Sequence, residues 1–250
     1  MSPDLPALLW ARVAAGFTQV AAPDAGILEL SLTLLVAAAV TVIPVTWRLF
    51  ALFVTLVHEL GHTFAGIMAG RIVTGVKLSF DHSGITKSYG RPGGLGEVWF
   101  TFWGYPVPAI VGGVLVWAGF SGWAPAALST GSVVLLLAVL GMRNLAGLAI
   151  TLGSAVVALF VVFFAPADVL GLTTVGLGLA LLVGAVRDWV KVLSVHRGEP
   201  EDRESSDAHS LLQSTGIPSP IWLGLFTVPI MGGWLLAAAS TIPAVLAATV

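Results

Sequence analysis

The feature that most constrains this chain is a series of seven apolar stretches, each long enough to cross or nearly cross a membrane. Only 10% of the residues are charged, whereas a soluble domain carries about 25%, so much of the surface needs a solvent other than water. We therefore expect an all-α polytopic membrane protein with about six to seven transmembrane helices, in which residues 1–250 form a single domain. The stretches are Ile27–Thr46, Leu49–Gly70, Val98–Phe120, Ala126–Gly141, Leu145–Ala165, Val169–Leu193 and Ile221–Ala239.

The segments outside these stretches predict three smaller features. Residues 1–25 place apolar side chains on one helical stripe with Arg12 in its middle, which favours an amphipathic interfacial helix over a cleavable signal peptide. An ordinary packed helix is the alternative for this segment. In residues 71–96, the alternating sequence VKLSF precedes the turn sequence DHSG, a pattern that predicts a β-hairpin. Residues 194–219 form a polar connection that ends in a short, partly apolar helix.

The basic residues predict an orientation in the membrane. If the N-terminus is cytoplasmic, ten of the eleven Lys and Arg residues fall on the cytoplasmic side, and only Arg48 falls on the outer side. We therefore expect a multi-pass protein of the cytoplasmic membrane, with the hairpin and the 194–219 connection both cytoplasmic. The preference for Arg over Lys and the abundance of Ala, Gly, Val and Leu indicate a bacterial genome rich in G and C.

Composition also excludes several classes of function. The net charge of −2 indicates no nucleic-acid partner. The absence of cysteine excludes disulfides, thiolate zinc ligands and cysteine nucleophiles. The expected partners are therefore the lipid bilayer and molecules within it, while the oligomeric state stays open.

The sequence TLVHELGHTF places two histidines and a glutamate inside the second apolar stretch. An acid at the centre of a membrane helix costs about 2.5 to 3.5 kcal/mol on insertion scales, so this cluster needs a partner. On a helix, His58 and His62 lie on one face, about 40° apart with about 6 Å of rise between them. Two imidazoles at this spacing can bind one zinc ion, and Glu59 beside them can act as a general base on an attacking water.

Two alternatives for this cluster involve no metal. The histidines can form hydrogen bonds between helices, and Glu59 can pair with a buried arginine. However, the stretch Leu49–Gly70 contains no basic residue. One Zn²⁺ per chain would offset the cost of all three polar groups, and the sequence therefore favours zinc.

A catalytic zinc ion normally has three protein ligands and one open position, so a third ligand must come from elsewhere in the chain. Asp207 is the best candidate, because it stands where the short helix of the 194–219 connection starts. By position alone, a role as helix N-cap explains this aspartate at least as well. For the remaining candidates, turns, helix caps and surface ion pairs are sufficient explanations. These candidates are Asp81, His82, Asp168, Asp188, His196 and His209.

In the order of its motifs, the chain resembles the site-2 protease group (M50) of intramembrane zinc metallopeptidases, and more closely the bacterial M50B-like branch. The resemblance covers most of the chain and rests on VHELGHTFAGIMAGRIVTGVKL, then GYPVPAIVGG, then SDA followed by TGIP. It implies that His58 and His62 are zinc ligands and that Glu59 is the catalytic base. Many site-2 proteases supply the third ligand from an L-D-G motif, but this sequence has no D-G dipeptide. The M50B-like branch uses an S-D-A stretch, which implies Asp207 as the third ligand.

This resemblance implies hydrolysis of a peptide bond in or near a transmembrane segment of a membrane-protein substrate. An edge strand of the hairpin would pair with the unwound substrate; the alternative is a structural hairpin that only packs on the membrane interface. Gly104, Pro106 and Pro108 would bend or break the third stretch and open a path for substrate and water. Asn144 would hydrogen-bond an intermediate or cap a helix. Two other functions stay open: a catalytically inactive relative acting as a scaffold or regulatory protein, and a metal or proton transporter.

Overall fold

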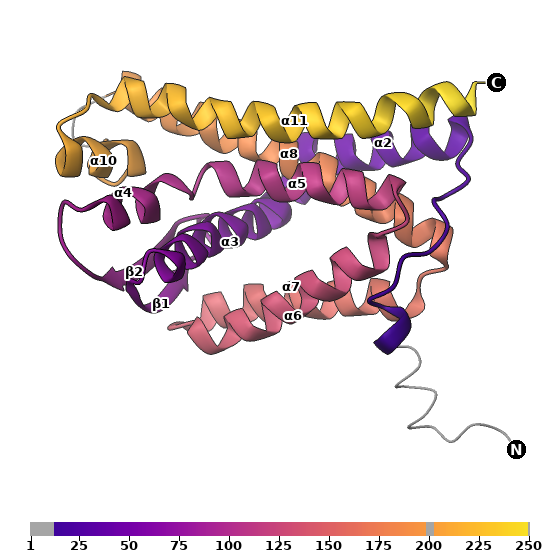
Figure 1. The fold of residues 1–250 in the computed structure, drawn as a ribbon, viewed down its shortest axis with the longest axis horizontal. Helices are drawn as coiled ribbons and strands as arrows, with labels where there is room; N and C mark the ends of the chain where they lie inside the picture. Colours follow the sequence, from indigo (N-terminus) through magenta and orange to yellow (C-terminus); the bar gives the residue numbers. More distant parts are fainter. Residues whose placement is uncertain (1–12, 199–202, 250) are drawn as a thin grey trace, which may run out of the picture.

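The computed structural model describes residues 13–198 and 203–249, which are mostly helical with a two-stranded sheet (Figure 1). Among these residues, five helices are long and apolar enough to cross a membrane, and the bent pair of α4 and α5 adds a sixth span if it is counted as one. The expectation of an all-α polytopic membrane protein with a small hairpin is confirmed. The five helices are α3 (Pro44–Met68), α6 (Ala124–Gly141), α7 (Leu145–Phe164), α8 (Ala167–Arg197) and α11 (Ser219–Ala248).

The boundary predicted between the first two stretches was wrong. Helix α2 (Ile27–Val42) ends before Pro44, which is the first residue of α3, and Ile43 between them is extended, with φ −70° and ψ 126°. A proline disfavours helical geometry in the residue before it and is well tolerated at the start of a helix. As a result, α2 has only 16 residues, fewer than the roughly 20 that span a bilayer.

The bend predicted in the third stretch is confirmed. Helices α4 (Leu95–Phe102) and α5 (Pro106–Phe120) meet at an angle of 56°. The break packs closely on α3, since a Cβ atom at Gly61 would lie 2.5 Å from the carbonyl oxygen of Trp103. The glycine of HELGH therefore allows the broken span to approach the helix that carries both histidines.

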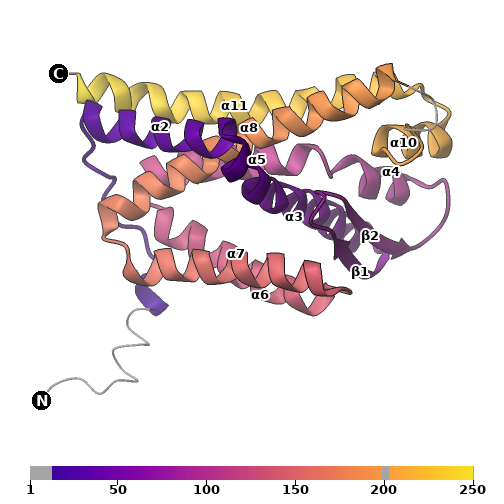
Figure 2. The same cartoon turned by 180° about the vertical axis from the view of Figure 1, so that it is seen from behind.

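The long helices form two groups with α3 between them (Figures 1 and 2). Helices α2, α5, α8 and α11 pack together on one side, and the antiparallel pair α6 and α7 forms the other side. Helix α3 crosses diagonally between these groups, while α4, the hairpin and α10 (Asp207–Thr215) lie at one end of the molecule. Elements distant in sequence therefore meet around the C-terminal half of α3.

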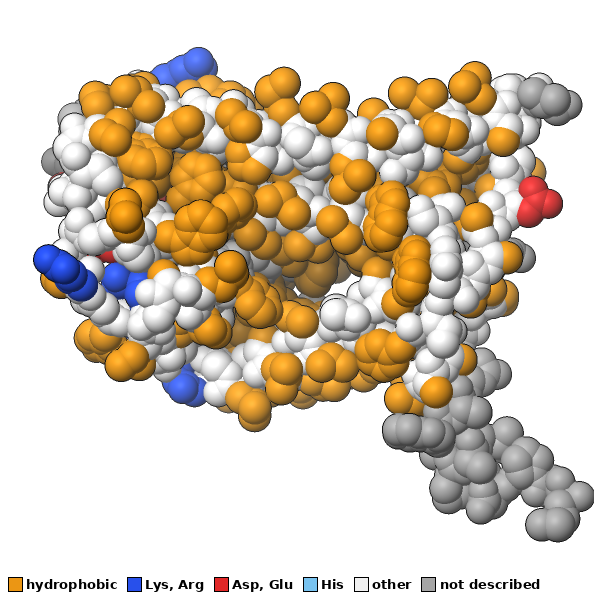
Figure 3. All heavy atoms as spheres, in the orientation of Figure 1, with side chains coloured by type: hydrophobic (Ala, Val, Ile, Leu, Met, Phe, Trp, Pro, Cys, Tyr) orange, Lys and Arg blue, Asp and Glu red, His pale blue; other side chains and the backbone are white. Residues whose placement is uncertain are grey.

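Side-chain types are distributed unevenly over the surface. In Figure 3, apolar side chains cover the helices along their length, as expected for surfaces that face hydrocarbon. The Lys and Arg side chains visible in this view lie toward the end that holds the hairpin and α10. This separation matches the charge asymmetry on which the predicted orientation depends.

The predicted hairpin consists of β1 (Ile72–Leu78) and β2 (Gly84–Tyr89), paired antiparallel with a bulge near Gly75. Its position was not predicted, because the hairpin runs back along α3 rather than away from it. The Nε2 atom of His82, in the turn, lies 2.9 Å from the carbonyl oxygen of Arg48. The sheet therefore lies beside a helix long enough to span a membrane.

The outer edge of β1 is covered by the α6–α7 connection. The backbone N–H of Arg143 donates to the carbonyl of Val76 at 2.9 Å, and the side-chain amide of Asn144 donates to the carbonyl of Leu78 at 2.6 Å. Asn144 also caps α7, because its side-chain oxygen accepts the N–H of Gly147. This finding supports the capping role considered for Asn144 and leaves β2 as the strand with an uncovered edge among the described residues.

The short helix predicted in the 194–219 connection is observed as α10, which ends at Thr215 and is followed by Gly216 in the left-handed conformation with φ 74°. The polar connection is shorter than expected, because α8 continues to Arg197. Residues 199–202 lie outside the described residues, as do residues 1–12, which make up half of the N-terminal segment predicted to be amphipathic. The connection therefore returns α10 to the helical core, where Leu211 packs in the cluster that includes Phe226 of α11.

Candidate metal centre

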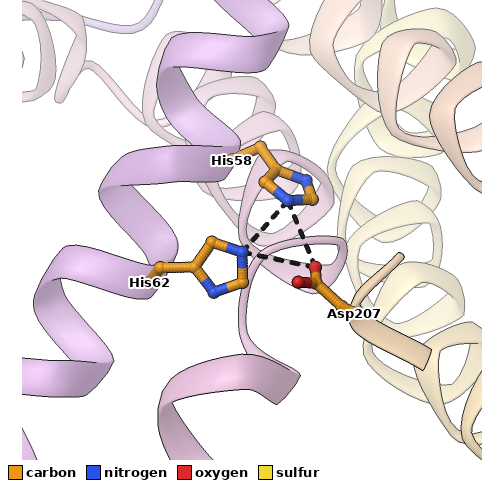
Figure 4. Close-up of side chains that lie close together, drawn as sticks. All are labelled: His58, His62 and Asp207. Atoms are coloured by element: carbon orange, nitrogen blue, oxygen red, sulfur yellow. Dashed lines mark hydrogen bonds and ion pairs between the residues drawn. The ribbon is translucent and has the colours of Figure 1, made fainter. Parts of the chain in front are cut away.

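Two ligand atoms of the candidate centre come from adjacent turns of α3. The Nε2 atoms of His58 and His62 lie 3.1 Å apart and point to the same side of the helix (Figure 4). The side chain of His62 is buried, and that of His58 is 14% exposed. The expected consequence of the four-residue spacing is therefore observed.

Asp207 supplies a third ligand atom from a distant part of the sequence. Its Oδ2 atom lies 3.3 Å from Nε2 of His58 and 3.3 Å from Nε2 of His62 (Figure 4). Asp207 is not the N-cap of α10, because Ser206 holds that position and its hydroxyl accepts the N–H of His209. The capping alternative for Asp207 is therefore wrong, and its carboxylate points to the two imidazoles.

The spacing of these atoms fits a bound metal ion. Zinc bonds to nitrogen and oxygen are about 2.0 to 2.2 Å long, and tetrahedral angles between such bonds separate the ligand atoms by roughly 3.3 to 3.6 Å. The three observed separations are 3.1, 3.3 and 3.3 Å. In addition, Oδ2 of Asp207 is buried and accepts no hydrogen bond in the described structure. A positive charge between this carboxylate oxygen and the two imidazole nitrogens would stabilise the arrangement, either as a proton on an imidazole or as a metal ion, and the three residues could hold a metal ion.

A glycine leaves room for the ion. At Gly104, in the break between α4 and α5, a Cβ atom would lie 2.5 Å from Nε2 of His58 and would also clash with Nε2 of His62. Any side chain larger than the hydrogen of glycine would therefore crowd both nitrogen atoms. The sequence GYP was predicted to bend the helix, and the structure adds that its glycine keeps the centre open.

Residues of α4 and of the break that follows it contact both imidazole rings. The Nδ1 atom of His62 lies 2.8 Å from the carbonyl oxygen of Phe100, which assigns the proton to Nδ1 and leaves the lone pair on Nε2. The ring of His58 meets the ring of Tyr105 edge-on at a centroid distance of 4.7 Å. No sequence motif identifies a backbone carbonyl as a partner, so the role of Phe100 could not have been predicted.

Glu59 is buried on α3 beside the hairpin. Its side chain is almost inaccessible, at 4% exposure, and its Oε2 atom accepts a hydrogen bond of 2.6 Å from the hydroxyl of Thr86 on β2. A Cβ atom at Gly84 would lie 2.6 Å from Oε1 of Glu59. The hairpin therefore packs directly on the carboxylate, a contact that the sequence analysis did not anticipate.

The environment of Asp207 favours its ionised form. Burial alone would raise the pKa of this carboxyl, but the adjacent imidazoles of His62 and His58 lower it below its usual range. A carboxylate that stays ionised is the form that binds a metal ion. The electrostatics and the spacing therefore support the same role for Asp207.

The other sequence candidates lie outside the centre. Asp81 is in the hairpin turn, where hydrogen bonds from the hydroxyl and N–H of Ser83 lower its pKa. The side chain of His209 lies 2.8 Å from the amide nitrogen of Gln213 on α10. Nε2 of His196 lies 2.8 Å from the hydroxyl of Ser206. Asp168 and Asp188 belong to α8.

A large apolar cavity lies elsewhere. Its volume is about 680 Å³, and it is lined by residues of α2, α3, α6, α7 and α8, including Leu49 and Phe53 of α3. At 100° per residue, these side chains lie on the face of α3 opposite the histidines. None of the three candidate ligands lines this cavity.

A family model described as Peptidase M50B-like matches residues 31–238 of the chain. The chain belongs to this M50B-like family. The matched region contains α3 with both histidines, the hairpin, the break between α4 and α5, and α10 with Asp207. No curated protein and no solved structure matches the chain significantly. The family and the apolar helices together show a multi-pass membrane protein of a peptidase family, with a group of side chains that could bind a metal ion.

Proposed function

We propose that this M50B-like protein is a zinc-dependent intramembrane metalloprotease, in which His58, His62 and Asp207 are the metal ligands and Glu59 is the catalytic base. The observation that carries the proposal is the convergence of three ligand atoms within 3.3 Å of one another, beside a buried glutamate. The substrate would be a membrane protein cleaved in or near a transmembrane segment.

The chemistry divides between the metal and Glu59. A bound zinc ion would supply Lewis acidity, which makes water a better nucleophile and polarises the scissile carbonyl. Glu59 takes one proton from the attacking water while the water oxygen bonds to the carbonyl carbon. Glu59 then gives that proton to the peptide nitrogen as the C–N bond breaks. The products are a carboxylic acid and an amine, which ionise to a carboxylate and an ammonium group, and Glu59 is regenerated.

The hairpin supports a way of holding the substrate. One edge of β2 is uncovered among the described residues, and Thr86 of this strand contacts Glu59. Uncovered backbone at membrane depth is tolerated only beside protein or a wet cavity. A substrate segment added to this edge would satisfy those backbone groups and bring an extended peptide beside the base. Unwinding of the substrate helix is required, because a helical peptide bond is shielded.

The proposal also includes the membrane orientation. A bacterial protein of the cytoplasmic membrane with its N-terminus in the cytoplasm would have its basic end, with α4, α10 and the open end of the hairpin, on the cytoplasmic side. The turn of the hairpin would then lie deeper in the membrane, beside Arg48 at the start of α3. Labelling of single cysteines introduced at Arg48 and Arg91 with a membrane-impermeant maleimide tests this orientation. Labelling at position 48 alone in intact cells is expected, and labelling at position 91 alone would overturn it.

The decisive experiment measures metal content and peptide hydrolysis in the same preparations. Purified wild-type protein is expected to contain one zinc ion per chain and to cleave a transmembrane substrate, whereas Glu59→Gln is expected to retain zinc and lose cleavage. Full activity of Glu59→Gln would show that the assigned mechanism is wrong. Zinc binding without cleavage of any transmembrane segment in a substrate library would favour the inactive relative. Zinc or proton flux into vesicles that is abolished by His58→Ala would favour the transporter.

A further inference from the structure

The third ligand stands on an element that is too short to position it unaided. Helix α10 has nine residues, and isolated helices shorter than about 12 to 15 residues are marginal in water. A metal site, however, requires its ligand distances to hold within about 0.2 Å. The contacts on either side of Asp207 therefore decide whether its carboxylate reaches the histidines.

The residue before Asp207 is anchored to α8. The Ser206 hydroxyl donates to the carbonyl of Arg203 at 2.9 Å, so its oxygen is left to accept hydrogen bonds. It accepts the N–H of His209 at 3.2 Å as the helix cap, and Nε2–H of His196 at 2.8 Å. Ser206 is buried. The C-terminal end of α8 is thereby tied to the position that precedes the ligand.

The residue after Asp207 is anchored to α11. The Ser219 hydroxyl donates to the carbonyl of Ala208 at 3.0 Å, and both residues are buried. Ala208 is fully buried and belongs to the core cluster that contains Trp222 and Phe226 of α11. A larger side chain at position 208 would have to displace this core. Each residue of the S-D-A stretch therefore has its own role. Ser206 caps α10 and ties it to α8, Asp207 is the proposed ligand, and Ala208 packs in the core against α11.

We propose that His196 and Ser219 are positioning residues for the metal centre, which hold Asp207 in place through its two sequence neighbours. This inference rests on the metal site proposed above. Neither residue touches the three ligand atoms. Their effect on zinc binding should therefore pass entirely through Asp207.

The test measures zinc affinity of the full-length protein in detergent by competition with a fluorescent zinc chelator. His196→Ala and Ser219→Ala are each expected to weaken zinc binding about tenfold, the lower end of the range for residues that support a ligand. His196→Gln is expected to restore most of the affinity, because its side-chain amide can donate to Ser206. The matched controls His209→Ala on α10 and Ser240→Ala on α11 should bind zinc as wild type, because both side chains bond only within their own helices among the described contacts.

A second set of variants, made in the Asp207→Ala protein, distinguishes an effect on the position of Asp207 from an effect on the stability of the whole protein. In the Asp207→Ala protein, the substitutions at positions 196 and 219 should no longer change zinc affinity, since the ligand that they hold is absent. Equal losses in both backgrounds, or wild-type affinity of His196→Ala, would overturn the inference while the metal site stood. Absence of zinc binding by the wild-type protein would overturn the proposed function as well.

Discussion

The two elements that build the candidate centre, α3 and α10, differ in almost every respect. Helix α3 has 25 residues, is long and apolar enough to cross a membrane, and carries two ligand candidates one turn apart. Helix α10 has nine residues and contributes one ligand candidate at its first position. Helix geometry places the two histidines of α3 on one face, whereas the position of Asp207 depends on contacts with α8 and α11. The positions of the two histidines on α3 therefore follow from local sequence spacing, whereas the position of Asp207 follows from tertiary contacts.

The largest effect is predicted for a substitution that fills the space beside the ligands of α3 and α10. Gly104→Ala would place a Cβ atom against Nε2 of both histidines. If the binding free energy of zinc, about 10 to 16 kcal/mol, is shared equally by four ligands, disturbing more than one of them should weaken zinc binding by more than about 1,000-fold. Competition with a chelator measures the affinity. Gly131→Ala on α6 is the control, because a Cβ atom there meets nothing within 4 Å. If the Gly104→Ala protein bound one zinc ion per chain with wild-type affinity, the metal site would have to lie elsewhere in the protein.

The next effect removes the contribution of α10 and leaves α3 intact. Asp207→Ala should weaken zinc binding by about 100- to 1,000-fold, since one of four ligands is lost. The two histidines remain one turn apart, so weak binding should persist. Isothermal titration with zinc at high protein concentration measures it. An Asp207→Ala protein that binds zinc as tightly as wild type would mean that α10 does not complete the centre.

A smaller effect separates the base from the metal. Gly84→Ala on β2 would crowd the carboxylate of Glu59 without touching either histidine. Cleavage should slow by about 100-fold, as for a catalytic group displaced by 1 Å, with zinc content unchanged. Gly153→Ala on α7, where a Cβ atom meets nothing within 4 Å, should cleave as wild type. Loss of zinc together with activity would indicate that the hairpin supports the metal rather than the base.

The last prediction concerns the pH dependence of zinc affinity. Zinc competes with protons for the two imidazole nitrogens, so zinc affinity should decrease as the pH is lowered from about 7 to about 5. The pKa of Asp207 is lowered, so its carboxylate stays ionised in this range and adds nothing to the dependence. Zinc affinity should therefore fall by up to about 100-fold per pH unit, two protons per ion. A transition in the range of an ordinary carboxyl group, near pH 4, would instead implicate Asp207.

The spacing and composition of the chain determined much of the protein without any tertiary information. Apolar stretches fix membrane helices because hydrocarbon leaves backbone groups no partner outside the helix. The four-residue spacing fixes the His58–His62 pair because it is one helical turn. The break at Gly104 and the hairpin follow from local turn and strand chemistry in the same way. These features were therefore correct in the sequence analysis.

Only the tertiary structure decided the remainder. Helices α8 and α11 position α10 so that Asp207 reaches the histidines while Ser206 caps the helix. From sequence position alone, a role of Asp207 as the N-cap was at least as well supported as a role as ligand. The partner of Glu59 is Thr86 because the hairpin folds back along α3, and the orientation of His62 is fixed by a backbone carbonyl of α4. Contacts between elements distant in sequence arise from the packing of whole helices, and no local pattern of residues encodes them.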